Sequence, residues 1–286
     1  MTQVIHPQTE LGTVTLIIKN LARSITFYKE VIGFEVLEQS EGHAALTADG
    51  KTVLIELEEH PDAIILPPRS TAGLYHYAIL LPDRKSLSLA LRHLSKRGIR
   101  IGQSDHLVSE ALYLSDPDGN GIEIYRDRPK SGWEKDQSGN YVMATDPLNI
   151  EDLLAEAGEE EWQGLPEGTT IGHIHLHTKD LESAREFYCH LLGFEPVGDY
   201  PSFRALFIAA GGYHHHIGLN IWAGIGAPAA SAHATGLKVY TIVLPDGQEL
   251  ATRVEILRQA KYEVNEHDGA FFVTDPAGIC IKLISR

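Results

Sequence analysis

Histidines are the side chains in this sequence with the widest chemical use, and several of them lie in apolar, strand-like stretches. His76 lies in GLYHYAIL, alternating histidines at 173, 175 and 177 occupy GHIHLH, and three adjacent histidines at 214 to 216 occupy YHHHIGLN. Imidazole either binds a transition metal or transfers protons near neutral pH. A single strand histidine is more often structural, and three adjacent ones can form a surface metal tract, so these histidines indicate a site only as a group.

The composition of the chain limits the kinds of protein that could hold these histidines. The 286 residues, 43% of them hydrophobic, suffice for a sizeable core and for two domains. A formal net charge of -15 argues against binding to nucleic acid or an anionic membrane, which requires clustered Lys and Arg. Because MTQVIHPQTELG lacks the pattern of a signal peptide and no run of about 18 apolar residues follows, a cytoplasmic protein is expected.

An internal repeat is the strongest organisational signal in the chain. LGTVTLIIKNLARSITFYKEVIGFEVL returns as IGHIHLHTKDLESAREFYCHLLGFEPV, and GLYHYAILLPD, from Gly73, returns as GLKVYTIVLPD, from Gly236. SDPDGNGIEIY likewise matches TDPAGICIKLI. The chain therefore contains four related units, two in each half.

Each unit has the same predicted pattern of elements. An apolar run such as Val14 to Ile18 predicts a strand, and the helical spacing of apolar residues from Arg23 to Ile32 predicts a helix that ends at Gly33. Short β-rich stretches joined at Asp49-Gly50 predict a hairpin. The units are therefore expected to be β-α-β-β-β, in an α+β protein.

The pattern also predicts the domain boundaries. Residues 1–128 form an N-terminal half with units at about 10–62 and 72–128, and residues 169–286 form a C-terminal half with units at about 169–224 and 235–286. Residues 129–168, rich in Pro, Gly and acidic residues, predict a linker with one short helix from Ile150 to Ala157.

The FY pair near the end of a helix, the following LGF or IGF and the later DPDGNxIE resemble the vicinal oxygen chelate superfamily, also called the glyoxalase/bleomycin-resistance/extradiol dioxygenase fold. Four units in one chain resemble the type I extradiol dioxygenases, and in particular the bacterial catechol 2,3-dioxygenases. The resemblance implies that units pair into two half-open barrels, with a metal held inside a barrel.

The resemblance implies metal ligands at the first strand of a unit and at the last. These positions hold His76 and Glu123 in unit two and His173 in unit three, whereas units one and four offer no good ligand. Two histidines and one carboxylate are typical of non-haem Fe(II) sites. Units two and three are therefore expected to form the metal-binding barrel, within one chain or across a dimer, and units one and four a metal-free barrel.

The resemblance also implies groups that handle protons and bind substrate. It favours His215 as the acid/base, with His216 as the alternative, because Asn220 stands at the ligand position of unit three and strand alternation aligns it with His216. Tyr113 and His106 match the residues that hold a substrate hydroxyl. His216 and Asn220 are also expected to line the substrate site.

The function implied is extradiol cleavage of a catechol or substituted catechol with O2, giving 2-hydroxymuconic semialdehyde, in the catabolism of aromatic hydrocarbons. The expected cofactor is Fe(II), with Mn(II) as the alternative because both accept N and O ligands. The expected partners are a small aromatic diol and O2, and a homo-oligomer is expected. Alternatives are a hydroquinone-cleaving dioxygenase, a glyoxalase-type metal enzyme and a drug-binding resistance protein without enzymatic activity.

Overall fold

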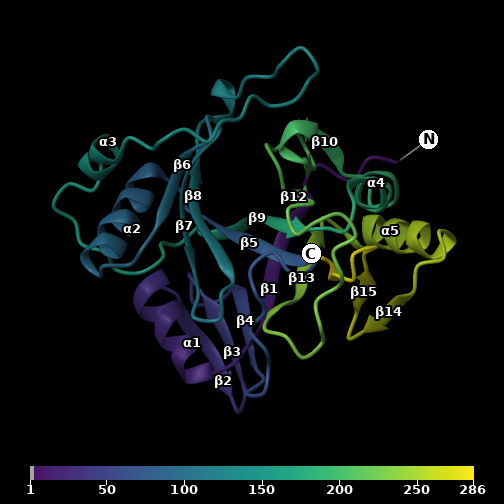
Figure 1. Cartoon of the computed structure of the whole chain (residues 1–286), viewed down its shortest axis with the longest axis horizontal. Helices are drawn as coiled ribbons and strands as arrows, with labels where there is room; N and C mark the ends of the chain where they lie inside the picture. Colours follow the sequence, from purple (N-terminus) through teal and green to yellow (C-terminus); the bar gives the residue numbers. More distant parts are fainter. Residues whose placement is uncertain (1–2) are drawn as a thin grey trace.

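The computed structural model describes residues 3–286, which form two eight-stranded curled sheets with few helices (Figure 1). One sheet has the order β10 (Glu195–Tyr200), β11 (Ala205–Ala209), β12 (Ile217–Asn220), β9 (Thr170–His177), β5 (Gly73–Leu80), β8 (Gly121–Asp127), β7 (Ser109–Ser115), β6 (Gly102–Asp105). The other has the order β14 (Val264–His267), β15 (Ala270–Thr274), β16 (Cys280–Ser285), β13 (Gly236–Leu244), β1 (Glu10–Ile18), β4 (Val53–Glu59), β3 (His43–Thr47), β2 (Glu35–Ser40). We call these the β5–β9 sheet and the β1–β13 sheet.

The four units have the predicted β-α-β-β-β order. Their helices are α1 (Leu21–Phe27), α2 (Arg84–Lys96), α4 (Leu181–Arg185) and α5 (Gly247–Gln259). The side chain of Asn20 caps the start of α1, and a π-helical turn, Tyr28–Ile32, continues α1 to Gly33, which has φ +99°. The predicted helix is thus confirmed, although its last turn is wider than an α-helical one. The α+β fold implied by the resemblance is confirmed.

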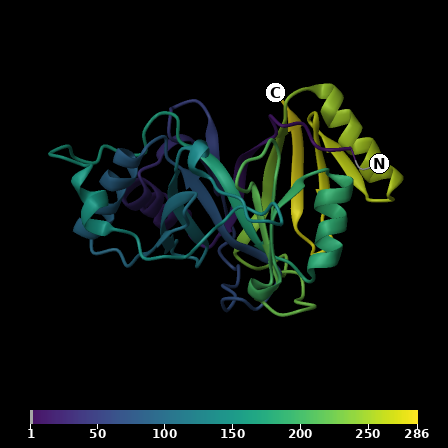
Figure 2. The ribbon, with the colours of Figure 1, turned by 90° about the horizontal axis from the view of Figure 1, so that it is seen from above.

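Each sheet combines strands from both halves of the chain. The first strands of units two and three, β5 and β9, pair antiparallel, and those of units one and four, β1 and β13, pair in the same way. The helices of the two halves remain apart, with α1 and α2 on one side and α4 and α5 on the other (Figures 1 and 2). The centre of each sheet is therefore a junction between the halves.

Two matching hydrogen-bond chains join consecutive units. The hydroxyl of Tyr28 donates to Asp116 at 3.1 Å, and Tyr77 donates to Tyr28 at 3.0 Å. In the second half, Tyr188 donates to Asp275 at 2.9 Å and receives a hydrogen bond from Tyr240 at 3.1 Å. The Tyr of each FY motif therefore hydrogen-bonds to the Asp of a DP motif in the interior. The two motifs also form a helix end and a turn.

The connector between the halves packs along the β5–β9 sheet. Its short helix is α3 (Ile150–Ala155), as predicted, and the acidic groups Asp152 and Glu156 form ion pairs with Arg84 of α2. Asp146 forms an isolated bridge with Asp105 of β6. These contacts bring the preceding residues, 143–145, to the rim of the sheet's concave face.

Of the helices in the described part of the chain, none reaches the length and hydrophobicity that crossing a bilayer requires.

Candidate metal centre

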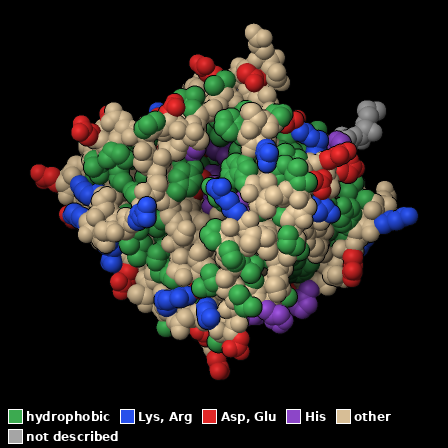
Figure 3. Space-filling model, in the orientation of Figure 1, with side chains coloured by type: hydrophobic (Ala, Val, Ile, Leu, Met, Phe, Trp, Pro, Cys, Tyr) green, Lys and Arg blue, Asp and Glu red, His purple; other side chains and the backbone are tan. Residues whose placement is uncertain are grey.

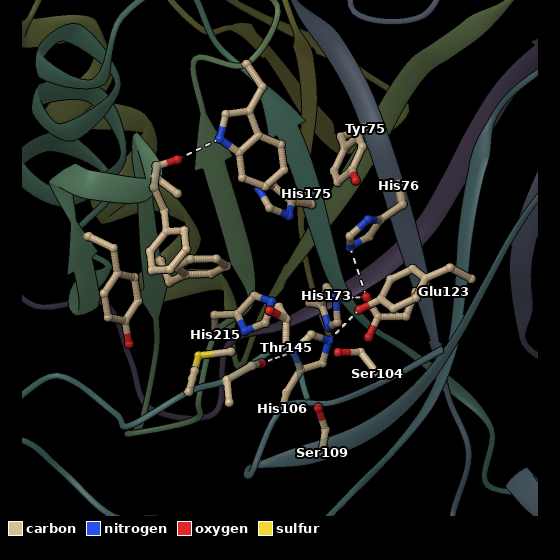
Figure 4. Close-up of a pocket in the computed structure, with 18 residues that line it drawn as sticks. Tyr75, His76, Ser104, His106, Ser109, Glu123, Thr145, His173, His175 and His215 are labelled. Atoms are coloured by element: carbon tan, nitrogen blue, oxygen red, sulfur yellow. Dashed lines mark hydrogen bonds and ion pairs between the residues drawn. The ribbon is translucent and has the colours of Figure 1, made fainter. Parts of the chain in front are cut away.

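Three side chains converge from neighbouring strands of the β5–β9 sheet. His76 comes from β5, Glu123 from β8 and His173 from β9, and one ligand atom of each lies within 4.8 Å of the others. The Nε2 atoms of His76 and His173 lie 3.0 and 3.1 Å from Oε2 of Glu123 (Figure 4). Ligand atoms at right angles around a cation at about 2.1 Å would be about 3.0 Å apart, so the spacing suits a shared ion.

Strand register explains the convergence. Ala78 of β5 lies between Glu123, its neighbour on β8, and His173, its neighbour on β9. His76 lies two residues earlier on the same face of β5, because side chains alternate along a strand. The three groups therefore cluster around the backbone of one strand.

Burial and charge make this cluster unusual for a protein interior. The three residues are at most 6% exposed, and neither Lys nor Arg is among the described residues that line the adjacent cavity. Burial raises the pKa of Glu123, but His173, followed by the nearby His76, outweighs it and holds that pKa well below its ordinary value. An ionised carboxylate with no fixed cation beside it is costly to bury. A bound cation would offset that cost.

His173 and His76 each have one feature that suits coordination. Burial lowers the pKa of His173, which favours the neutral ring that binds metals. His76 Nε2 is buried and has no hydrogen-bond partner of acceptable geometry among the described residues. An orphaned imidazole nitrogen that points at a carboxylate oxygen is accounted for by a metal ligand.

The cluster lies on the wall of a cavity of about 320 Å³, a size suited to a small aromatic molecule. Figure 3 shows histidine side chains in a hollow on this face of the molecule. Aromatic and apolar side chains line much of the rest, namely Tyr75, Met143, Tyr200, Phe203, Phe207 and Trp222. Ser104, Ser109 and Thr145 add hydroxyl groups.

Two predicted groups, His106 and Tyr113, lie together in this cavity. His106 Nδ1 donates to the carbonyl oxygen of Ala144 at 2.6 Å, which leaves Nε2 to meet the Tyr113 hydroxyl, also at 2.6 Å. With its proton on Nδ1, the His106 ring accepts the hydrogen bond of the Tyr113 hydroxyl on Nε2. Burial, followed by the charge of Glu123, raises the pKa of Tyr113 well above its ordinary value. Tyr113 is thus a protonated hydrogen-bond donor beside the metal cluster.

The three adjacent histidines point in different directions. His215 lines the cavity, and its ring centroid lies 4.2 Å from that of His173 (Figure 4). Burial, and then the charge of His173, lowers the pKa of His215 well below its ordinary value. His214 is fully buried behind the cavity.

The structure does not bring two expected substrate contacts, His216 and Asn220, to the cavity. His216 Nδ1 accepts a hydrogen bond from the Ala210 amide at 3.1 Å, and the oxygen of Asn220 lies 2.6 Å from Nδ1 of His177. His177 lies outside the cavity with Asn220. Both side chains thus form hydrogen bonds within the protein, outside the cavity, and Nδ2 of Asn220 is buried without a partner among the described residues.

The position that matches Glu123 in unit three is Gly218 and not Asn220. Glu123 is the β8 neighbour of Ala78, and Gly218 is the β12 neighbour of His175. A Cβ atom added at Gly218 would lie 2.9 Å from the His175 ring, so His175 fills the space that an acidic side chain would need. The site therefore offers three candidate ligands, and His175 packs in the cavity wall beside them.

Several cavity residues were not predicted. Met143, Ala144 and Thr145 come from the connector, and Phe203 and Trp222 come from loops around β11 and β12. The repeat contains no signal for them because the connector and these loops have no counterpart in every unit. The cluster of aromatic residues from Tyr200 to Phe207 is the one local signal that could have indicated a cavity wall.

Comparisons with known proteins agree with this architecture. A sequence profile of the Glyoxalase/Bleomycin resistance protein/Dioxygenase superfamily matches residues 10–124 and 170–283. A catechol-2,3-dioxygenase of Bacillus subtilis strain 168 is 56% identical over 272 residues, 95% of each chain. The glutathione transferase FosA of Serratia marcescens is 26% identical over 40% of this chain and 79% of its own length.

Solved structures share the fold at low sequence identity. A Bacillus subtilis protein provisionally assigned as a dioxygenase aligns with a TM-score of 0.70 at 14% identity, over 99% of this chain and 86% of its own. Glyoxalase I from Zea mays aligns with a TM-score of 0.59 at 15% identity, over 97% and 92%. The profile match over both halves and the 56% identity to a relative of equal length show that the chain belongs to the Glyoxalase/Bleomycin resistance protein/Dioxygenase superfamily.

Proposed function

We propose that this protein is an extradiol dioxygenase that opens the ring of a catechol with O2, using one Fe(II) held by His76, His173 and Glu123. The observation that carries the proposal is the buried cluster of two imidazoles and one carboxylate on the wall of an aromatic cavity. The 56% identity to a catechol-2,3-dioxygenase supports the choice of substrate class.

The donor set fits the proposed metal. Two imidazoles and a carboxylate suit Fe(II), and three protein ligands leave positions for other molecules. When bound, the iron supplies Lewis acidity toward catechol oxygens and the redox capacity that O2 chemistry requires. With Gly218 where a fourth ligand would stand, the site favours ring cleavage over the four-ligand pattern of glyoxalases.

The protein's own residues position the substrate and move its protons. The Tyr113 hydroxyl is held by His106 and would turn its hydrogen bond to a catechol oxygen when substrate enters. The neutral ring of His215 accepts a proton from the second catechol hydroxyl and returns it later in the cycle. Aromatic side chains such as Phe207 and Trp222 pack on the substrate ring and exclude water.

The experiment starts with anaerobic purification, loading with Fe(II) or Mn(II), metal analysis and an absorbance assay for the yellow 2-hydroxymuconic semialdehyde. We expect one metal ion per chain and product from catechol. Substitution of His76, Glu123 or His173 by Ala should abolish both metal and product. His177→Ala is the matched control, because His177 lies on β9 with His173 but outside the cavity.

The same experiment separates the alternatives. Full metal binding by all three Ala variants would overturn the ligand assignment. A metal-loaded wild type that cleaves hydroquinone but not catechol, or that isomerises a hemithioacetal, would replace the proposed reaction. Tight binding of an aromatic drug without turnover of any of these substrates would favour a resistance protein.

A further inference from the structure

A hydrogen-bonded chain leads from the edge of the cavity wall to His215. His214 Nε2 lies 2.7 Å from Oδ1 of Asp127, and His214 Nδ1 lies 2.9 Å from Nδ1 of His215. The His214 side chain is fully buried, whereas that of Asp127 is 24% exposed. The chain therefore connects a partly exposed carboxylate to a ring in the cavity wall.

The chemistry of the two ends fixes the direction of these hydrogen bonds. A carboxylate only accepts, so the proton between Asp127 and His214 belongs to Nε2 of His214. When Nε2 carries the one proton of the His214 ring, the lone pair is on Nδ1. Because two facing ring nitrogens must be one donor and one acceptor, the proton between the rings belongs to Nδ1 of His215.

This inference rests on the proposed function. We propose that Asp127 and His214 are positioning residues that hold His215 in one tautomer, with the proton on Nδ1 and none on Nε2. The unprotonated Nε2 is then the base that accepts the catechol proton. Among the described residues, His215 Nε2 has no hydrogen-bond partner, while its ring lines the cavity (Figure 4). A histidine whose second nitrogen is anchored presents one defined nitrogen to substrate.

The surroundings of His214 keep its ring in one orientation. Tyr213 packs on it at 4.2 Å between ring centroids, and Trp133 meets it edge-on at 5.1 Å. The Tyr213 hydroxyl also lies 2.6 Å from that of Tyr125. An aromatic cage of this kind prevents the ring from turning away from Asp127.

The anchor lies on the same strand as a metal ligand. Asp127 ends β8 and is four residues after Glu123, so both side chains project from one face of that strand. One strand thus positions a metal ligand and the residue that orients the base. The spacing between the metal ligand and the anchor of the base is set by strand geometry, because no loop lies between Glu123 and Asp127.

The test compares Asp127→Asn with Asp127→Glu in iron-loaded enzyme. Asn matches the size of Asp, but its amide also donates, so the proton of His214 Nε2 is no longer held by a pure acceptor. We expect Asp127→Asn to lower kcat for catechol about 100-fold, the low end of general-base contributions, with KM and iron content within about twofold of wild type. Asp127→Glu retains a carboxylate and should restore most of the loss.

Substrate acidity separates a role in orienting the base from a packing role. A nitrocatechol gives up its proton more readily, so loss of a base matters less, and the Asp127→Asn defect should shrink at least about tenfold with that substrate. Packing damage would lower turnover of both substrates equally. Asp268→Asn is the control, since this Asp is exposed in the turn between β14 and β15 of the other sheet and its φ of +49° suits Asn.

The outcomes are distinguishable. Near-wild-type kcat in Asp127→Asn, or equal defects with catechol and nitrocatechol, would overturn the assignment of the tautomer while the proposed function survives. Wild-type enzyme that holds iron but opens neither ring would overturn the proposed function, and the role of His215 with it.

Discussion

The β5–β9 sheet and the β1–β13 sheet have the same strand order, the same antiparallel central pair and matching Tyr–Tyr–Asp chains, but they differ at a few side chains. By the repeat, the positions of His76, Glu123 and His173 are taken in the β1–β13 sheet by Val239, Lys282 and Thr13. Thr13 donates to the Val53 carbonyl at 2.9 Å. The Thr13 hydroxyl of the β1–β13 sheet therefore has a hydrogen-bond partner, whereas His76 Nε2 of the β5–β9 sheet has none among the described residues.

The comparison separates what maintains the fold from what performs chemistry. Packing of apolar strands and the buried Tyr–Asp contacts recur in both sheets, so they serve the architecture. The candidate metal cluster occurs in one sheet, so it differs from the other sheet by side chains placed on the same backbone arrangement. Glu56 shows the same point, because it pairs with Thr15 of β1 as Glu123 pairs with Ala78 of β5. It accepts a hydrogen bond from Thr15 at 2.8 Å, and no histidine of the described residues hydrogen-bonds to it.

The largest expected effect comes from changing one carboxylate in each sheet. Glu123→Gln removes the charged ligand and should abolish metal binding and ring cleavage, measured by metal analysis and the absorbance assay. Glu56→Gln, the matched change in the β1–β13 sheet, should leave both unchanged. Loss of iron in the Glu56 variant would break the comparison, since it would place metal chemistry in both sheets.

The next largest effect concerns Tyr113. Its counterpart in the β1–β13 sheet is Phe272, and each faces the last strand of its unit, opposite Glu123 and Lys282 respectively. Tyr113→Phe therefore makes the site resemble the metal-free sheet at one atom. We expect kcat to fall about 10- to 100-fold with iron retained, because a hydrogen bond to the substrate is lost. An unchanged kcat would remove Tyr113 from the reaction.

A smaller effect should appear in acid stability, because buried histidines are concentrated in the β5–β9 sheet. Burial, and then the charges of His214 and His173, lowers the pKa of His216 to about 3. The unfolded chain binds this proton near pH 6.5, so the stabilisation is complete above pH 6.5 and is lost as the pH falls toward 3.

For His216 this linkage amounts to about 2 kcal/mol between pH 7 and pH 5. The variant His216→Gln cannot titrate, so its free energy of unfolding in urea should fall by about 2 kcal/mol less than that of wild type over this range. An identical pH dependence in the two proteins would contradict a neutral, buried His216.

The smallest expected effect tests whether the matching Tyr–Asp hydrogen bonds stabilise the two halves of the chain equally. Tyr28→Phe and Tyr188→Phe each remove a buried hydrogen bond to an Asp whose other contacts remain, so each should cost about 1–2 kcal/mol in urea unfolding. Similar losses would show that the two joints are equivalent. A large loss at one alone would show that the halves differ in stability as well as in chemistry.

The sequence by itself determined the four units and the positions of the three candidate metal ligands. Local periodicity can be read directly from the sequence. It underlies the repeat, the helix signals before Gly33 and the alternation of GHIHLH. His76, Glu123 and His173 converge in the structure because each lies within a strand, where alternation fixes the facing side.

Only the tertiary structure decided which of the adjacent histidines faces the cavity. His214 to His216 precede β12, in an irregular segment where strand alternation does not apply, so His215 turns inward and His216 binds the Ala210 amide. The place of Gly218 opposite His175, the connector residues at 143–145 and the link from Asp127 to His214 depend on contacts between distant segments. Local patterns carry no information about such contacts, because they are fixed only when the sheets form.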